Sequence, residues 1–339
     1  MDISSPIVSS LYNSIYHGLG TGYPYLILSI ILYFIALSVF LSVFAYLFGW
    51  IERKFIARIQ SRHGPTYVGK YGILQNFADL VKLLSKESIT PEKAHKILYR
   101  LALPSLIAVF ILVVALIPIT SGFVALNSSI SLLIIVSLIT LSPLLIMIAG
   151  WSSGNRFGSI SAQRSVVMLI AYEIPLLLVI ASVGLIAHSY SISSIVSFQA
   201  SHWLLLLDPI GFILFFIIML AELERPPFDL READSELIAG WLTDVDAPYY
   251  ALALLLDYMR VFALSLLITV IFLGGWLGPA VLPAIIWLLV KVLLIALFTI
   301  FLRATTMRMR LDRLLRLGWQ YLMPIAVANI AIVFLIFGK

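Results

Sequence analysis

Residues 221–246, which read AELERPPFDLREADSELIAGWLTDVD, hold nearly half of the acidic side chains of this 339-residue chain. Apolar runs flank this acidic segment, at residues 203–220 and 249–273, and each is about long enough to cross a hydrocarbon layer of ~30 Å. The acidic segment is therefore predicted to emerge at a membrane surface between two transmembrane helices. It contains eight of the 17 carboxylates: Glu222, Glu224, Asp229, Glu232, Asp234, Glu236, Asp244 and Asp246.

The overall composition is that of a membrane protein. Hydrophobic residues make up 62% of the chain and charged residues 12%, whereas about a quarter of the residues in a soluble domain are charged. The apolar runs are continuous and do not alternate with polar residues, which favours helices over a β-barrel. The sequence thus predicts an all-α fold, a polytopic helical bundle in the membrane.

Eight transmembrane helices are predicted within a single membrane domain, 1–339. They lie at about 24–50, 101–122, 129–151, 160–187, 203–220, 249–273, 280–303 and 319–337. Residues 1–22 carry a mildly amphipathic patch formed by Ile7, Leu11 and Ile15, and they are predicted to include a short interfacial helix before the first span.

Lysine and arginine are distributed unevenly between the two sides of the predicted bundle. The loops at 51–100, 152–159, 221–248 and 304–318 hold all of the loop lysines and arginines, and the opposite loops hold none. Because positively charged loops stay on the inner side of the membrane, these four are predicted to be inner loops, with both termini outside. Lys339, in the tail after the last span, is the one exception.

The residues needed for several kinds of chemistry are missing from the sequence. The chain has no cysteine, which excludes disulfides and cysteine-ligated iron–sulfur clusters. Its five histidines are scattered, so no metal site is expected. No nucleophile elbow or glycine-rich phosphate loop is present. No residue is therefore predicted to be catalytic, and any redox centre is expected on a partner protein.

Four ionisable residues stand out within the predicted spans, Glu173, Asp257, Arg260 and Lys291, and Arg164 lies near the end of a span. A charge at the middle of a bilayer costs roughly 2.5 to 3.5 kcal/mol on insertion scales, so such side chains usually face the bundle interior and are paired. Asp257 and Arg260 are three residues apart and share a helix face. They are interpreted either as an internal salt bridge that holds one helix in place or, with Glu173 and Lys291, as a buried relay for protons or ions.

The acidic segment itself has two interpretations. It is either a solvated face, which is typical of charge runs, or a segment that docks a soluble partner or a polar headgroup. Pro226 and Pro227 stiffen its backbone. Interleaved apolar residues predict that it packs against the bundle, and these are Phe228, Leu230, Leu237 and Ile238.

Four blocks of sequence together resemble one protein family. They are ERKFIARIQSRHGPTYVGKYGILQNFADLVKLLSKE (52–87), GWSSGNRFGSISAQRSVVMLIAYEIPL (150–176), AELERPPFDLREADSEL (221–237) and RATTMRMRLDRLLRLGWQYLMPIAVANI (303–330). Their motifs and their order resemble the quinone-site membrane subunit of respiratory complex I, which is called the H subunit in prokaryotes and subunit 1 in mitochondria. The resemblance covers most of the chain.

This resemblance implies a core membrane subunit of a proton-translocating quinone oxidoreductase, an enzyme of the translocase class. In that family, quinone is bound jointly with two soluble subunits, one of which carries the terminal iron–sulfur cluster. Antiporter-like and small membrane subunits are further implied partners. The implied location is an energy-coupling membrane such as the prokaryotic plasma membrane.

The resemblance also implies roles for individual residues. Asp244 and Asp246, at the end of the acidic segment, are expected to be solvated or docking charges. The implied quinone-chamber and proton-coupling residues are Glu52, Arg53, Lys82, Glu222, Arg225, Asp234, Glu236, Arg303 and Arg308. Asp257 and Glu173 of the predicted relay also match acidic positions of the family.

Two other functions remain open at this point. The homologous membrane subunit of energy-converting hydrogenases couples to a nickel–iron partner and binds no quinone. A stand-alone secondary transporter would also be a polytopic bundle, although the internal repeats typical of many transporters are not seen. The electron donor and the type of quinone are not indicated by the sequence.

Overall fold

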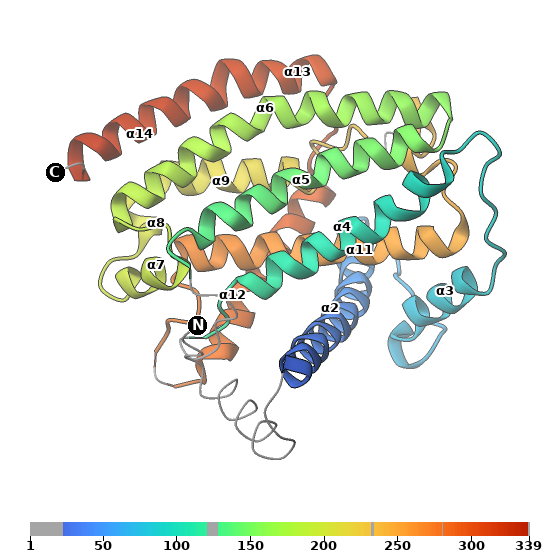
Figure 1. Cartoon of the computed structure of the whole chain (residues 1–339), viewed down its shortest axis with the longest axis horizontal. Helices are drawn as coiled ribbons and strands as arrows, with labels where there is room; N and C mark the ends of the chain where they lie inside the picture. The colour runs from blue at the N-terminus through green and yellow to red at the C-terminus, as the bar shows by residue number, and fades with distance from the viewer. Residues whose placement is uncertain (1–22, 121–127, 232–233, 280, 338–339) are drawn as a thin grey trace.

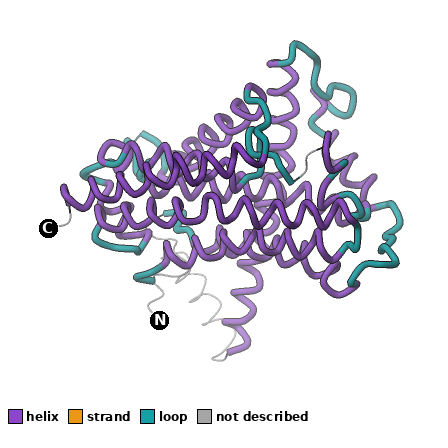
Figure 2. The backbone as a smooth tube through the Cα atoms, turned by 90° about the horizontal axis from the view of Figure 1, so that it is seen from above, coloured by secondary structure: helices purple, strands orange, loops and turns teal. Residues whose placement is uncertain are grey.

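The computed structural model describes residues 23–120, 128–231, 234–279 and 281–337, and helices account for the regular structure of these ranges (Figures 1 and 2). The all-α prediction is confirmed. The predicted interfacial helix falls in residues 1–22, outside the described ranges.

Seven helices of the described ranges are long and apolar enough to cross a membrane. They are α2 (Tyr23–Ile59), α4 (Lys96–Leu116), α5 (Ser131–Ser152), α6 (Arg156–Ala187), α11 (Ala247–Phe272), α12 (Ala284–Thr305) and a last unit made of α13 (Leu311–Arg316), a π-helical turn η3 (Leu317–Leu322) and α14 (Met323–Phe337). The chain is a multi-pass membrane protein.

The predicted span at 203–220 is divided into two helices. A single turn, α8 (Leu204–Leu207), is followed by the apolar α9 (Pro209–Glu222). Proline at the first position of α9 cannot donate a backbone hydrogen bond, and Asp208 caps the helix by accepting from the Gly211 amide at 2.7 Å. With 14 residues, α9 is about 21 Å long, shorter than the other spans.

The helix boundaries place two of the predicted site residues differently from the prediction. Helix α2 continues nine residues past the predicted end of the first span, so Glu52 and Arg53 lie on a helix and not in a loop. The residues after Trp50 are good helix formers, and the helix ends before the left-handed Ser61 (φ 53°) and the Gly64–Pro65 pair. The rest of the inner segments contains short helices: η1 (Lys70–Gly72), α3 (Gln75–Leu84), α10 (Asp234–Leu237) and η2 (Gly240–Leu242).

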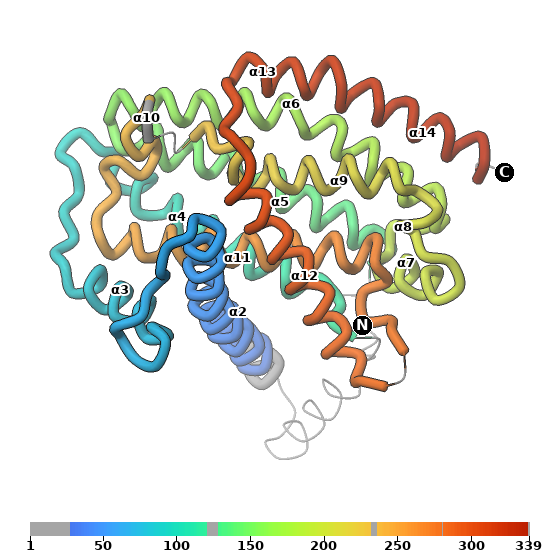
Figure 3. The backbone as a smooth tube through the Cα atoms, turned by 180° about the vertical axis from the view of Figure 1, so that it is seen from behind, coloured from blue at the N-terminus to red at the C-terminus, as the bar shows by residue number. Residues whose placement is uncertain are grey.

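Helices α6 and α11 form the centre of the bundle. The apolar window of α11 is 78% buried and that of α6 is 56% buried, against 17% for α2 and 22% for the last unit. Helix α6 packs against α5, α9 and α14, and α11 packs against α2, α4 and α12 (Figures 1 and 3). The periphery, where α2 and α14 lie, exposes many apolar side chains, as expected for helices that face the hydrocarbon of a membrane.

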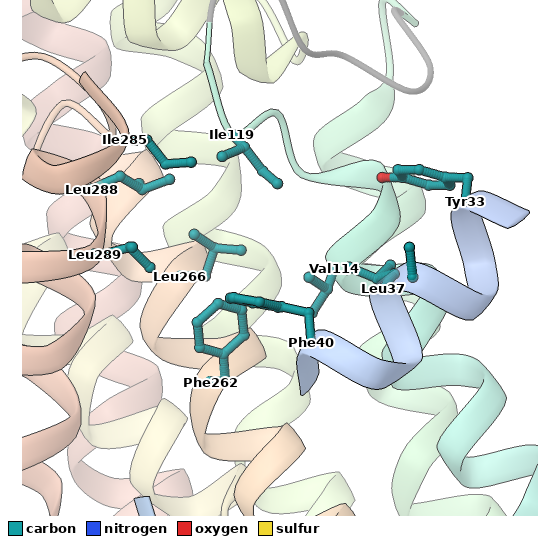
Figure 4. A pocket seen from close by; sticks show the side chains of 11 residues that line it. Tyr33, Leu37, Phe40, Val114, Ile119, Phe262, Leu266, Ile285, Leu288 and Leu289 are labelled. Carbon is teal, nitrogen blue, oxygen red and sulfur yellow. The ribbon is translucent and has the colours of Figure 1, made fainter. Parts of the chain in front are cut away.

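An apolar pocket of about 280 Å³ lies between α2, α4, α11 and α12 (Figure 4). Tyr33 and Phe40 of α2 face Phe262 of α11 and Leu288 of α12 across it. No charged side chain lines this pocket, so it is separate from the charged residues that the sequence singles out.

Candidate functional site

The acidic segment folds into the bundle and does not lie on its surface as a solvated loop. Glu222, Glu224, Arg225 and Arg231 are all buried, and Arg231 has no exposed surface at all. The interleaved side chains of Phe228, Leu230 and Leu237 are buried as predicted, whereas Ile238 is exposed. Burying so many charges is stable only where each one is paired, so the pairs define the site.

Glu52 is the link between three segments of the chain. It lies on the inner extension of α2 and is buried. One carboxylate oxygen is 3.0 Å from Arg225 of the acidic segment, and the other accepts a hydrogen bond from Arg303 at the end of α12. The Arg225 guanidinium also lies 5.8 Å from the centre of the Tyr258 ring of α11.

Glu224 forms the second pair of contacts. Its carboxylate is ion-paired with Arg231, later in the acidic segment, and is 2.6 Å from Arg260 of α11. Arg260 also donates to the backbone carbonyl of Glu222. The backbone of Glu224 is left-handed (φ 56°), which turns the chain sharply after α9 and directs this side chain into the bundle.

Glu222 is the last residue of α9 and is buried against α6. Its carboxylate accepts a hydrogen bond of 2.8 Å from the Tyr172 hydroxyl. The sequence pointed to the neighbouring Glu173, which is only half-buried. Successive residues of a helix point about 100° apart, so Tyr172 faces the core while Glu173 is turned away from it.

Glu236 is an exposed acid of the site. Its carboxylate is 2.6 Å from Arg164 of α6 and 3.5 Å from Arg308, after α12. The hydrogen bond from Arg164 is the main reason why the pKa of Glu236 lies below its ordinary value, and the positive charge of Arg308 adds to this. Asp234 begins α10, but its side chain lies outside the described part of the structure.

Arg53 and Lys82 lie away from the buried pairs. Arg53 is 2.6 Å from Asp79 of α3, and both side chains are partly exposed. Burial raises the pKa of Asp79, but hydrogen bonds from Arg53 and Gln75 outweigh it, so the pKa lies below its ordinary value. Lys82 is exposed on α3. These residues connect α2 to α3 at the edge of the molecule.

The four charges of the predicted relay are not joined to one another by ion pairs in the described ranges. Arg260 pairs with Glu224 and not with Asp257, because the folded acidic segment brings a carboxylate to its guanidinium. Asp257 is half-buried on the same helix. Lys291 donates to three backbone carbonyls at the end of α11, those of Leu273, Gly275 and Leu277, at 2.7, 3.1 and 2.6 Å.

Three features of the site differ from the sequence-based expectations. Arg231 is not among the site residues that the sequence predicts, although its position between hydrophobic residues and acids is a signal of burial. Asp246 is buried and accepts a hydrogen bond from Ser88, so the expectation that it is a solvated charge is wrong. Asp208, which the sequence analysis does not single out, is buried and accepts from Ser182 of α6 and Asn329 of α14, at 2.9 and 3.2 Å.

The arrangement can transmit a change of charge through the bundle. Glu52 pairs with Arg225 and Arg303, Glu224 pairs with Arg231 and Arg260, and Glu222 accepts from Tyr172 in the middle of α6. Two unit charges ~4 Å apart interact by about 4 kcal/mol at an effective dielectric constant of ~20. Adding or removing one charge therefore changes the protonation of its neighbours. In the part of the chain that the structure describes, no group of three or more histidine or acidic side chains could hold a metal ion.

Comparisons with known proteins identify relatives over most of the chain. The family described as NADH dehydrogenase matches residues 31–334. A protein of Dehalococcoides mccartyi, named as the H subunit of NADH-quinone oxidoreductase, is 39% identical over 285 residues, which cover 84% of this chain and 80% of that protein. A second such protein, from Syntrophobacter fumaroxidans, is 38% identical, covering 84% and 88%. The equivalent protein of a Geobacillus species is also 38% identical, covering 84% and 87%.

Proposed function

The chain belongs to the family of the NADH-quinone oxidoreductase H subunit, the membrane subunit of a complex I-type oxidoreductase, and from this premise we propose that its charged cluster couples quinone reduction to proton translocation. The cluster consists of Glu52, Glu222 and Glu224 with Arg225, Arg231, Arg260 and Arg303. The observation that carries the proposal is that two buried carboxylates tie the acidic segment to its neighbours: Glu52 of α2 pairs with Arg225 and with Arg303 of α12, and Glu224 pairs with Arg231 and with Arg260 of α11.

In this proposal, the inner segments of the chain form one wall of a quinone chamber that partner subunits complete. Glu236, Arg164 and Arg308 form one charged part of it. Glu52 and Arg225 are buried, and Arg303, which pairs with Glu52, is itself exposed. Arg53, Lys82 and Asp234 are proposed as further chamber residues. Partner subunits supply the electrons, since this chain has no cysteine with which to hold a cluster.

The residues of this chain respond to the charge that appears in the chamber. Reduction of a quinone places negative charge on its oxygens until protons neutralise it. Arginines of the cluster stabilise such charge, and the paired carboxylates then bind or release protons according to the field they feel. The Tyr172 hydroxyl, which donates to Glu222, extends the chain of polar contacts into α6. Glu173, Asp257 and Lys291 are proposed to act further inside the membrane.

The substitution Glu222→Gln in the assembled complex tests this proposal. The variant complex is reconstituted in vesicles and supplied with its own electron donor. It is expected to move fewer protons per quinone reduced, by a factor on the order of ten, because the charge of one carboxylate changes the electrostatic energy of its neighbours by several kcal/mol. Quinone reduction should fall less than proton movement. Glu87→Gln, at an exposed inner position, is the matched control.

Two results would contradict the proposal. One is a Glu222→Gln complex that keeps both quinone reduction and proton movement at the level of the control. The other is a co-purifying nickel–iron large subunit, identified by mass spectrometry of the native complex together with its retained small molecules, because it would indicate a membrane subunit of an energy-converting hydrogenase.

A further inference from the structure

Arg231 is the largest side chain of the described ranges that is almost completely buried, and its exposed fraction is 0%. Its backbone is held from two sides. The carbonyl of Arg231 accepts a hydrogen bond of 2.8 Å from Ser161 of α6, and Gly240 packs so closely that a Cβ there would lie 1.7 Å from the same oxygen. Because the backbone cannot move, the guanidinium cannot swing out to the surface.

The charges around Arg231 balance one another. Glu222 and Glu224 are the two buried acids at the end of α9, and Arg231 and Arg260 are the two buried bases that interact with both of them. Tyr172 of α6 adds a neutral donor. An uncompensated buried charge costs several kcal/mol, so the group protonates or the region rearranges instead. Without Arg231, this group would hold two carboxylates against a single guanidinium.

We infer that Arg231 is a positioning residue that holds Glu224 in its ion pair and supplies one of the two positive charges that oppose the uptake of a further proton by the Glu222–Glu224 pair. This inference rests on the proposed coupling function, because the pair lies within the proposed charged cluster. Arg231 acts only through these two carboxylates. The other charged groups that face the pair are Arg225, on the acidic segment, and Asp257, on α11, and the Glu52 pairs lie beyond them.

The substitution Arg231→Met provides the test, because methionine fills similar space without a charge. The variant complex should bind more protons than the wild type near neutral pH, since one carboxylate loses its counter-charge. In infrared difference spectra, this proton uptake appears as the carbonyl band of a neutral carboxylic acid. Arg62→Met makes the same chemical change at an exposed position and should produce no such band.

Thermal stability supplies a second measurement that does not depend on quinone. A glutamate whose pKa is higher in the folded variant than in the unfolded chain stabilises the folded state at low pH. This stabilisation is lost as the pH rises from the ordinary pKa of Glu, about 4.3, through the raised pKa of the folded variant. The melting temperature of the Arg231→Met complex should therefore fall further below that of the wild type as the pH rises. A purely structural loss would lower it by the same amount at every pH.

Two more variants keep the test decisive if Arg231→Met fails to assemble. Arg231→Met combined with Glu224→Gln removes one charge of each sign, so it should assemble, lack the carboxylic acid band and lose the extra pH dependence. Arg231→Lys keeps the charge and should resemble the wild type. The inference is overturned if the double variant behaves like Arg231→Met. It is also overturned if the Arg231→Met complex assembles without taking up a proton. Either outcome can be recognised whether or not Glu222→Gln uncouples the complex.

Discussion

At the scale of single residues, the charges of this protein fall into two classes that the structure separates by burial. Glu52 and its partner Arg225 are buried, whereas Arg53 and Asp79 are both partly exposed, although Glu52 and Arg53 are adjacent in the sequence. A buried pair costs desolvation energy that its own attraction does not always recover, so burial by itself is weak evidence for a stabilising role. The buried charges are those to which the proposed function assigns a role, whereas the exposed pair attaches α3 to α2.

Removing one carboxylate from each class should have very different effects. Glu52→Gln leaves the Arg225 guanidinium buried without a counter-charge and weakens the tie to Arg303, so we expect a loss of about 3 to 5 kcal/mol of stability. Asp79→Asn removes a partly exposed pair and should cost less than about 1 kcal/mol. Thermal unfolding of the two variant complexes measures the difference. Equal losses would mean that burial in the structure is not what decides the effect.

At the scale of elements, backbone groups decide where the helices end and how they are joined. After α11, the chain turns through Gly274 and Gly275, both left-handed, and the carbonyls of Leu273, Gly275 and Leu277 in this turn point to one place. Lys291 of α12 supplies them with an ammonium group, which also lies 5.3 Å from the centre of the Trp203 ring. Gln199 of α7 (Ile192–Gln199) completes the junction, accepting from the Gly274 amide at 2.8 Å. These contacts assign Lys291 an anchoring role, which is the alternative to its proposed role in proton transfer.

The substitution Lys291→Met should therefore loosen the turn between α11 and α12. Hydrogen bonds to charged groups contribute about 1.5 to 3 kcal/mol each, but Lys291 is only partly buried, so we expect local opening to become easier by about 2 kcal/mol in total. Amide hydrogen exchange at residues 273–279 measures this opening. Lys86→Met, at an exposed position of an inner segment, serves as the control. A variant that abolishes proton movement while leaving exchange unchanged would instead support the relay.

At the scale of the whole molecule, the arrangement places the charged cluster beside the two most buried helices and leaves α2, α12 and α14 at the edges. The predicted inner segments all meet around this cluster, since Glu52, Arg164, Arg225 and Arg308 come from four of them or from the adjoining helix ends. Convergence of segments that are far apart in sequence agrees with the predicted orientation, in which the basic loops share one side of the membrane.

The absence of cysteine makes this orientation directly testable. Single cysteines introduced at Lys86 and Lys93 should react with a membrane-impermeant thiol reagent only from the inner side. Cysteines at Ser201 and Val281, which are also exposed, should react only from the outer side. Labelling of intact cells detects cysteines on the outer side, and labelling of inverted vesicles detects cysteines on the inner side. Reaction of both pairs from one side would contradict an orientation with the termini outside.

The sequence by itself was sufficient to predict the all-α membrane fold and the family. The length of the apolar runs, the charge of the loops and the order of the motifs are properties of the sequence that do not depend on tertiary contacts. It also identified most members of the charged cluster as notable residues. It did not identify their partners. Helical spacing pairs Arg260 with Asp257, its neighbour on the same helix face, and the family resemblance selects Glu173 where Tyr172 makes the contact.

Only the tertiary structure decided which charges are buried and which of them meet. The Glu52–Arg303 contact joins residues 251 positions apart, and the role of Arg231 depends on the fold of the acidic segment against α6 and α11. The physical reason is that a charge is stabilised by whatever approaches it in space. Hydrophobic and charge patterns along the sequence indicate whether a segment faces lipid or water. They do not indicate which distant side chain pairs with a buried charge.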